Sequence, residues 1–279
     1  MKKVGNKLKT YLTHIFCKMK SKTFITSLIL LTIIFISGCI EDSEIIDNTE
    51  NTLTTQQQNV ELKAVEGIDF INTDNYANTR LEYYYYIPEA VAENKQKSYP
   101  LLVMAPSLSG RGEHFVTQEF KNFADEENFL IVSPSFTWDE KNWDSRQSYQ
   151  YPSVWSGDAL IEIIEKLEES NDVTISNLYL FGYSAGAQFS LRFSLYKPDM
   201  CIACAAHGSG GTVAPSENVD VKFFVTVGKQ DTSRIRKAET FYNFARMHHI
   251  DVEYKEYDTG HSLTPAQIKD SLDFFKGVS

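Results

Sequence analysis

The sequence predicts an α/β protein whose mostly parallel central sheet is covered by helices on both faces. Three observations carry this prediction. Uninterrupted apolar runs, typical of strands buried on both sides, recur along the chain. Segments with apolar residues at helical spacing separate them. The length of 279 residues, with 42% hydrophobic and 13% aromatic residues, suits one large domain with a substantial core.

The expected elements alternate along the chain. Strands are predicted where short apolar runs end in loop residues, at 80–88, 99–106, 129–136, 177–182, 201–208, 221–228 and 251–257. Helices are predicted from the amphipathic spacing at 114–128, 157–170, 185–196, 235–249 and 264–277. Ligands of such sheets bind beyond the carboxyl ends of the strands, so the loops that follow the strands are where a site is expected.

The first 38 residues have the features of a secretory signal. Lysines precede an apolar stretch at 24–36, which is short for a spanning helix of about 20 residues. The stretch ends in Ile36-Ser37-Gly38-Cys39, which resembles the lipobox of bacterial and archaeal lipoproteins. The resemblance implies cleavage before Cys39 and a lipid on its thiol. An uncleaved membrane anchor is the alternative, and both interpretations place the rest of the chain on the extracytoplasmic face of the cell membrane.

We therefore expect three parts: a lipoprotein signal peptide at 1–38, a flexible tether at 39–61 and the folded domain at 62–279. Residues 40–60 are polar and lack aromatic side chains, as linkers do. The chain has a net charge of −10; cleavage would remove seven of its 27 basic residues and none of its 37 acidic ones, leaving −17. Such a charge argues against a nucleic-acid partner and leaves membrane attachment to the lipid.

Ser184 lies in Gly182-Tyr183-Ser184-Ala185-Gly186, a G-x-S-x-G motif between an expected strand and an expected helix. Small neighbours permit the strained strand-to-helix turn that exposes a serine Oγ above the sheet edge, near a helix N terminus. A bare G-x-S-x-G also arises by chance, so its context has to decide. Here an apolar run precedes the motif and a helical pattern follows it, as expected around a nucleophilic serine.

A serine nucleophile needs a base, and an acid and a histidine are expected to follow it in that order. Asp231 follows the expected strand 221–228, and His261 lies in the loop after the strand 251–257. Asp258 is a weaker candidate because it lies only three residues from His261. His207 precedes Asp231 and breaks the order. The predicted roles are attack by Ser184, proton transfer by His261 and orientation of the imidazole by Asp231.

Negative charge on the attacked carbonyl oxygen requires fixed donors. The backbone N–H of Ala185, directly after the nucleophile, is one candidate. Another is expected from the loop 105–112, where Pro106 has no N–H, so that Ser107 or Leu108 is the candidate donor.

From about residue 80 to 275 the chain resembles an α/β-hydrolase. Within that superfamily it is similar to the poly(3-hydroxybutyrate) depolymerase and feruloyl esterase group, and more distantly to dienelactone hydrolases. The stretches that carry the resemblance are 99–110, 177–210, 223–231 and 259–265. It implies the α/β-hydrolase fold and esterase activity, with Ser184, Asp231 and His261 at the triad positions. The short connection at 211–220 implies a minimal cap. The chain departs from the pattern at Ala105-Pro106, where many members have His-Gly, and at Ala187-Gln188, where a second glycine is common.

An aromatic-rich stretch at 136–155 joins a strand to a helix. Long loops at this edge often build substrate pockets, so Trp138, Trp143 and Tyr149 are candidate pocket walls, with Tyr151, Trp155 and Arg146 near them. Tyr183, beside the nucleophile, is a further candidate contact. The alternative is a loop packed on its own aromatic rings.

No cofactor-binding or metal-binding pattern is found, so no cofactor is expected. Cys201 and Cys204 form a CxxC in an expected strand, where residues three apart face opposite sides, which indicates two core residues; a redox pair is the alternative. The sequence predicts a lipid-anchored serine esterase acting on a small-molecule or polymer ester. A serine peptidase or acyltransferase on the same fold, or a non-catalytic surface-binding lipoprotein, remain alternatives.

Overall fold

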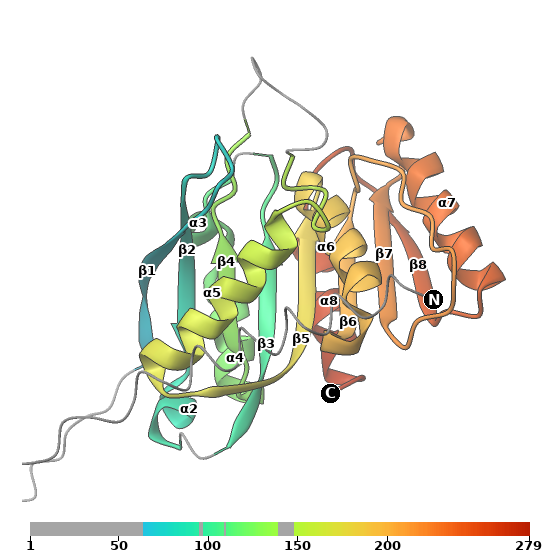
Figure 1. Cartoon of the computed structure of the whole chain (residues 1–279). Helices are drawn as coiled ribbons and strands as arrows, with labels where there is room; N and C mark the ends of the chain where they lie inside the picture. Colours follow the sequence, from blue (N-terminus) through green and yellow to red (C-terminus); the bar gives the residue numbers. More distant parts are fainter. Residues whose placement is uncertain (1–63, 95–96, 109, 139–147) are drawn as a thin grey trace, which may run out of the picture. The chain divides into compact units, whose positions relative to one another are not determined.

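The computed structural model describes residues 64–94, 97–108, 110–138 and 148–279, and a mixed sheet forms its centre (Figure 1). Within these residues the sheet has eight strands in the order β1-β2-β4-β3-β5-β6-β7-β8. Their bounds are β1 Val65–Asn72, β2 Arg80–Ile87, β3 Ser98–Ala105, β4 Leu130–Pro134, β5 Thr174–Tyr183, β6 Cys201–His207, β7 Lys222–Gly228 and β8 Val252–Tyr257.

Strand direction gathers the loops at one edge. The pairs β1–β2 and β2–β4 are antiparallel, whereas all pairs from β4 through β3 to β8 are parallel. The loops after β3, β5, β6, β7 and β8 therefore leave from the same edge, which we call the carboxyl rim. The mostly parallel sheet predicted from the sequence is confirmed.

Helices cover both faces of the sheet (Figure 1). Buried side chains of α5, α6 and α7 pack in one core cluster, and those of α4 and α8 pack in a second. The helix bounds are α2 Glu89–Glu93, α3 Gly112–Phe115, α4 Gln118–Glu127, α5 Ser156–Asn171, α6 Ala185–Tyr196, α7 Thr232–Met247 and α8 Pro265–Lys276, with a 3₁₀ turn η1 at Pro198–Met200.

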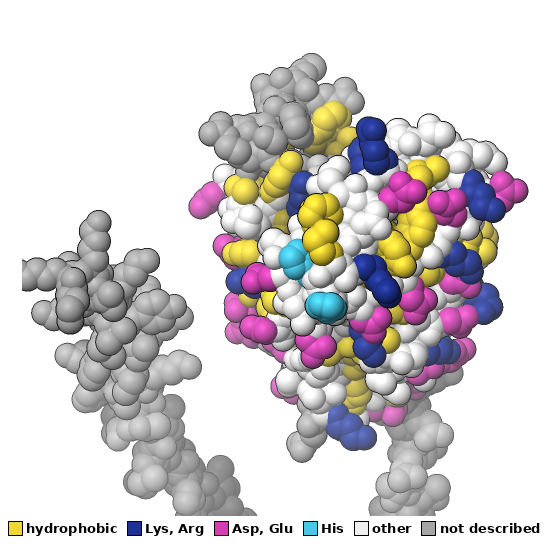
Figure 2. Space-filling view, turned by 90° about the vertical axis from the view of Figure 1, so that its right-hand side faces the viewer, with side chains coloured by type: hydrophobic (Ala, Val, Ile, Leu, Met, Phe, Trp, Pro, Cys, Tyr) yellow, Lys and Arg dark blue, Asp and Glu magenta, His cyan; other side chains and the backbone are white. Residues whose placement is uncertain are grey.

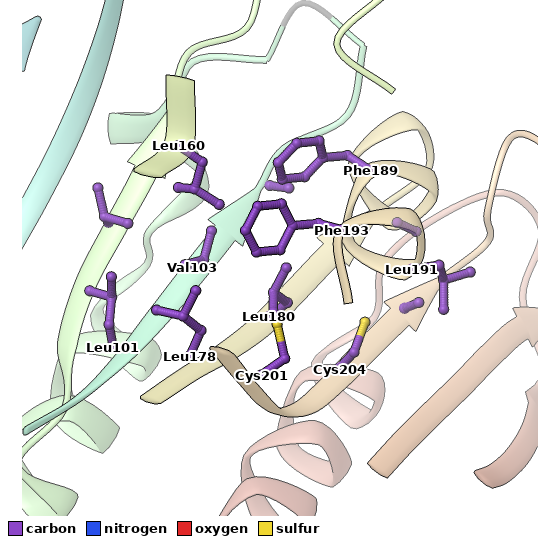
Figure 3. Close-up of a cluster of buried hydrophobic side chains, with 14 of the residues drawn as sticks. Leu101, Val103, Leu160, Leu178, Leu180, Phe189, Leu191, Phe193, Cys201 and Cys204 are labelled. Carbon is purple, nitrogen blue, oxygen red and sulfur yellow. The ribbon is translucent and has the colours of Figure 1, made fainter. Parts of the chain in front are cut away.

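The alternation of strand side chains explains the two clusters. Along β3, Leu101, Val103 and Ala105 belong to the cluster under α5 and α6, and Leu102 and Met104 belong to the opposite one. All five are 0% exposed. Because every second residue of a strand faces the same side, an unbroken apolar run fills both layers. Figure 3 shows the first cluster, with side chains of α6 against those of β3 and β5.

The single helix expected at 114–128 is wrong. The chain forms the short α3, then extends at Val116 (φ −84°, ψ 99°), and begins α4 after Thr117. Val116 is 6% exposed and belongs to the core cluster beneath α4. Burial of this side chain in the core accompanies the break, which amphipathic spacing alone did not reveal.

The expectation that Cys201 and Cys204 face opposite sides is also wrong. Cys201 pairs with Leu178 and Ala203 pairs with Tyr179, so Ile202 is an extra residue in β6 and forms a bulge. The bulge brings both sulfurs into one cluster (Figure 3). Both thiols are buried and free. Burial raises the pKa of Cys201 to about 12 and that of Cys204 still further, which keeps both as core thiols rather than reactive thiolates.

Candidate active site

Ser184 occupies a strained turn between β5 and α6. Its φ of 57° and ψ of −110° are rare for a residue with a side chain. Backbone hydrogen bonds hold the turn: the Ser184 N–H donates to the carbonyl of His207 at 2.9 Å, and its own carbonyl accepts from Gln188 and Gly210 at 3.2 Å each. The turn is thus fixed to both α6 and the loop after β6.

The two glycines of the motif are required by close backbone approaches. A Cβ on Gly182 would lie 2.5 Å from the carbonyl oxygen of Gly186. A Cβ on Gly186 would lie 2.0 Å from the oxygen of Ala105 and 2.4 Å from that of Pro106. The second contact also shows that the loop after β3 lies against the first turn of α6.

The structure brings Ser184, His261 and Asp231 together at the carboxyl rim. His261 Nε2 lies 3.0 Å from Ser184 Oγ, and His261 Nδ1 lies 2.7 Å from Asp231 Oδ2. Asp231 follows β7, and His261 lies in the loop between β8 and α8. The side chain of Asp231 is 5% exposed and that of His261 is 32% exposed, so the chain of hydrogen bonds runs from a buried acid through a partly exposed imidazole to the half-buried Ser184.

The second oxygen of Asp231 is held as well. Asp231 is the N-cap residue of α7, yet its side chain makes no capping hydrogen bond there. Instead Oδ1 accepts from Ser233 Oγ at 3.1 Å and from Arg234 Nη1 at 3.2 Å. Arg234 therefore supplies a positive charge to a buried carboxylate that also faces the imidazole. No sequence pattern marked Arg234, although its position one helical turn after Asp231 places the two side chains on neighbouring sites.

Gly208 is a second residue that the sequence analysis did not single out. It has a φ of 58°, and a Cβ there would lie 3.2 Å from His261 Nδ1. A side chain at this position would press on the imidazole at the nitrogen that faces Asp231. The available signal was a glycine at the carboxyl end of the expected strand 201–208.

Of the expected oxyanion donors, Ala185 directly follows Ser184 in the chain. Ala185 is the first residue of α6, so its N–H has no acceptor within the helix. Ser107 and Leu108 lie in the loop after β3 that contacts Gly186; Ser107 is half-buried and Leu108 is 39% exposed. The Ser107 carbonyl accepts from the Gly110 N–H at 2.8 Å, which closes a turn there.

The aromatic candidates are divided. Tyr149 is 1% exposed and its ring stacks on Phe136, with 4.6 Å between ring centroids. Trp155 meets the same Phe136 edge-to-face. The expectation that Tyr149 walls a pocket does not fit this burial, because a ring in the core has no free face for a substrate. Trp138 is half-buried after β4, and Trp143 and Arg146 lie outside the described residues.

Tyr183 contacts His261 through both its hydroxyl and its ring. Its hydroxyl donates to the carbonyl oxygen of His261 at 2.9 Å, and its ring stacks on the imidazole with centroids 5.1 Å apart and planes 25° apart. Burial raises the pKa of Tyr183, so the hydroxyl keeps its proton and remains a donor.

The competing candidates have other partners. His207 is 0% exposed, and its ring contacts Thr226 Oγ1 at 2.7 Å and Ser271 Oγ at 3.0 Å beneath the site. Burial lowers the pKa of His207 to about 3, so the ring stays neutral. Asp258 is exposed and accepts from Gln230 Nε2 at 3.3 Å. Neither replaces Asp231 beside the imidazole.

The described part of the chain contains neither a metal-binding cluster nor a membrane-spanning helix. No group of three or more His, Cys, Asp and Glu side chains there is arranged to hold a metal ion. No described helix is both long enough and apolar enough to cross a membrane. The apolar stretch at 24–36 and Cys39 lie outside the described residues.

The face on the side of α7 and β8 carries mixed charge. Figure 2 shows Lys and Arg side chains interspersed with Asp and Glu over this face. Two apolar side chains of α7 are exposed among the described residues there, Phe244 at 39% and Met247 at 65%. Mixed charge of this kind is typical of a solvated surface.

No family model and no curated protein matches the chain, but its fold matches solved structures. A ferulic acid esterase has a TM-score of 0.62 at 15% identity, over 78% of this chain and 100% of that one. An S-formylglutathione hydrolase from Agrobacterium tumefaciens has 0.59 at 15%, over 78% and 96%. The poly(3-hydroxybutyrate) depolymerase of Bordetella parapertussis has 0.55 at 17%, over 76% and 91%. With its sheet order and surrounding helices, the protein has the α/β-hydrolase fold.

Proposed function

We propose that this protein is a serine hydrolase that cleaves carboxylic esters through an acyl-enzyme. One observation carries the proposal: Ser184 Oγ, the His261 imidazole and the Asp231 carboxylate form a continuous chain of contacts of 3.0 and 2.7 Å at the carboxyl rim. A hydroxyl with a base and an orienting acid is the arrangement that activates serine. The names of the structural neighbours, an esterase and two hydrolytic enzymes among them, agree with it.

The reaction follows from these contacts. Ser184 Oγ attacks the acyl carbon while its proton passes to His261 Nε2, and a tetrahedral oxyanion forms. Collapse of this species breaks the bond to the alkoxide, which takes the proton from His261 and leaves as the alcohol. Water then attacks the acyl-serine with the same histidine as base, which releases the acid and restores Ser184. Asp231, with its second oxygen held by Ser233 and Arg234, fixes the Nδ1–H tautomer and stabilises the imidazolium.

Two features support ester chemistry at this site. The N–H of Ala185 directly follows Ser184, and the loop after β3, which continues into Ser107 and Leu108, contacts the first turn of α6 through Ala105 and Pro106; an oxyanion formed at Ser184 needs donors of this kind. The connection between β6 and β7 spans residues 208–221 and contains no helix or strand, so among the described residues this connection forms no cap domain over the half-buried Ser184. An open site of this kind accepts either a small ester or one bond of a polymer.

We also propose that the enzyme is held at the extracytoplasmic face of the cell membrane by a lipid on Cys39. The support is the sequence Ile36-Ser37-Gly38-Cys39 after a basic, apolar segment, followed by the polar tether. The enzyme then acts on esters that reach the cell surface, and its strongly acidic domain does not itself bind anionic lipid.

One labelling experiment tests both proposals. Cells expressing the full chain, Ser184→Ala or Cys39→Ala are separated into membrane and soluble fractions and treated with a fluorescent fluorophosphonate, and ester turnover is measured on p-nitrophenyl esters of different acyl length. We expect a labelled membrane band for the wild type and none for Ser184→Ala. Cys39→Ala is expected to be labelled but unprocessed or released from the membrane.

The outcomes separate the proposals. Labelling that persists in Ser184→Ala excludes this nucleophile. Labelling without turnover of any ester favours a peptidase or acyltransferase on the same triad. Unchanged mass and membrane retention in Cys39→Ala contradict the lipid anchor and leave the hydrolase proposal intact.

A further inference from the structure

Tyr183 links the nucleophile to its base by a route outside the catalytic hydrogen bonds. It is the last residue of β5 and directly precedes Ser184. Its hydroxyl reaches the main chain of His261 at 2.9 Å, and its ring lies 5.1 Å from the imidazole. The path from the Ser184 backbone through Tyr183 to His261, and back through Nε2 to Ser184 Oγ, therefore closes on itself.

The loop that carries His261 is closed by its own hydrogen bonds, from the Ser262 N–H to the Gly260 carbonyl at 3.0 Å and between the hydroxyls of Thr259 and Ser262 at 2.5 Å, and none of these bonds involves His261. His261 and Ser262 are exposed, and a Cβ on Gly260 would meet nothing within 4 Å. The bond from the Gln230 N–H to the Thr259 carbonyl at 3.0 Å holds the start of the loop, two residues before His261. At His261 itself, the Tyr183 hydroxyl supplies a fixed point on the main chain.

We propose that Tyr183 is a positioning residue that holds His261 in register with Ser184, rather than a wall of the substrate pocket. This inference rests on the proposed function and deepens it. The hydroxyl fixes the main chain of the base, and misplacement of a reacting group by about 1 Å can cost about 100-fold in rate. The stacked ring limits rotation of the imidazole, and its π face favours the imidazolium that forms during the reaction.

The geometry distinguishes this role from that of a substrate contact. One face of the Tyr183 ring is occupied by the imidazole, and its hydroxyl is used by the His261 carbonyl. A side chain committed in this way acts on the rate of the chemical step. A substrate contact that is equal in the ground and transition states would instead change KM.

The test uses two substitutions of Tyr183 and one matched control. Tyr183→Phe keeps the ring and removes the hydroxyl, and Tyr183→Leu removes both. Tyr254→Phe removes another phenol, which donates to Glu256 on β8 at 2.8 Å, on the strand that leads to the same loop. For each variant we measure kcat and KM on p-nitrophenyl esters, the rate of fluorophosphonate labelling and the melting temperature.

We expect Tyr183→Phe to lower kcat and the labelling rate about threefold to tenfold with KM unchanged, as for one lost hydrogen bond. Tyr183→Leu should lower kcat and the labelling rate by about 100-fold, so that the phenylalanine variant keeps part of the activity that the leucine variant loses. Tyr254→Phe should match the wild type.

Two results overturn the inference: a raised KM with kcat retained, which makes Tyr183 a substrate contact, or kcat and labelling unchanged in Tyr183→Phe. If Tyr183→Leu does not fold, the phenylalanine variant still decides. A wild-type chain that neither labels nor turns over any ester contradicts the proposed function itself, and is recognised before any variant is compared.

Discussion

Ser184 has a backbone conformation that costs about 1–3 kcal/mol in a residue with a side chain. The surrounding bonds explain why it persists: its N–H and its carbonyl are held by β6, by α6 and by the loop after β6. The strained conformation points Oγ toward His261 Nε2. A serine in an ordinary strand-to-helix turn would be free to relax, so the strain is a local sign of function.

The acid of the proposed triad is Asp231. Asp231 and Asp258 were the two candidate acids in the sequence, and the structure places Asp231 Oδ2 at 2.7 Å from His261 Nδ1 while Asp258 accepts from Gln230. Asp231→Asn is expected to lower kcat by about 10³- to 10⁴-fold, because an amide at this position no longer holds the required tautomer. The matched variant Asp258→Asn should keep kcat within about twofold of the wild type, because the bond of Asp258 with Gln230 is exposed to solvent and contributes little.

Steady-state kinetics on one p-nitrophenyl ester, with circular dichroism to show that both variants fold, gives the comparison. Equal losses in the two variants, or a larger loss in Asp258→Asn, would mean that the carboxylate next to the imidazole is not the one that serves it in solution.

At the scale of elements, the contact between the first turn of α6 and the loop after β3 decides how the site is assembled. Gly186 lies where any side chain would collide with two backbone oxygens, those of Ala105 and Pro106. Backbone cannot move aside as a flexible side chain can. Helix and loop therefore stay in contact only while position 186 has no Cβ.

Gly186→Ala is expected to destabilise the protein by about 2–4 kcal/mol, because either α6 or the loop must shift. The same shift moves the loop that contains Ser107 and Leu108 away from α6, so labelling by a fluorophosphonate should slow. Gly210→Ala is the control: its Cβ would lie 3.6 Å from Gln188 Oε1 and 3.9 Å from the Ser184 carbonyl oxygen, which are ordinary contacts. We expect it to stay within about 0.5 kcal/mol of the wild type.

Urea unfolding monitored by tryptophan fluorescence measures both glycine variants. If Gly186→Ala is as stable as Gly210→Ala and is labelled at the wild-type rate, α6 and the loop after β3 tolerate a side chain at position 186.

The elements also show what a sequence can and cannot reveal. Apolar runs identified strands such as β3 and β7 because both faces of these strands are buried. β1 was not predicted, since it lies at the sheet edge with mostly exposed or half-buried residues. The break at Val116 and the bulge at Ile202 escaped prediction because each depends on which neighbour a side chain packs against.

In the whole molecule, the parallel sheet is what gathers the candidate site. The triad side chains come from three loops that leave the carboxyl rim after β5, β7 and β8. Their convergence could be anticipated from the sequence, because each of these loops follows a predicted strand and the loops after parallel strands leave from one edge of the sheet. Three other contacts could not be anticipated, because they depend on how the loops and α7 pack against one another. They are those of Arg234 with Asp231, of Gly208 with His261 and of Tyr183 with His261.

The sheet is joined to α8 by a buried polar network centred on His207. Its ring contacts Thr226 and Ser271, and Gln267 Nε2 donates to Thr226 Oγ1 at 2.9 Å. The same Gln267 forms a capping box with Thr264, three residues after His261. Because the network links strands under Ser184 to the helix after His261, its protonation state bears on the stability of the entire fold.

His207 predicts how that stability depends on pH. Burial lowers its pKa to about 3, against about 6.5 in the unfolded chain. Between these values the unfolded chain binds a proton that the folded protein does not, so stability is lost as the pH falls.

Over pH 7 to 5, where most carboxylates are still ionised, the contribution is about 2 kcal/mol. Urea unfolding at pH 7 and at pH 5 should show that the free energy of unfolding falls by about 2 kcal/mol more in the wild type than in His207→Gln. His114→Gln, with a side chain 74% exposed, controls for the loss of one imidazole. An equal loss in the wild type and His207→Gln would mean that His207 takes up a proton in the folded protein, which the buried network does not permit.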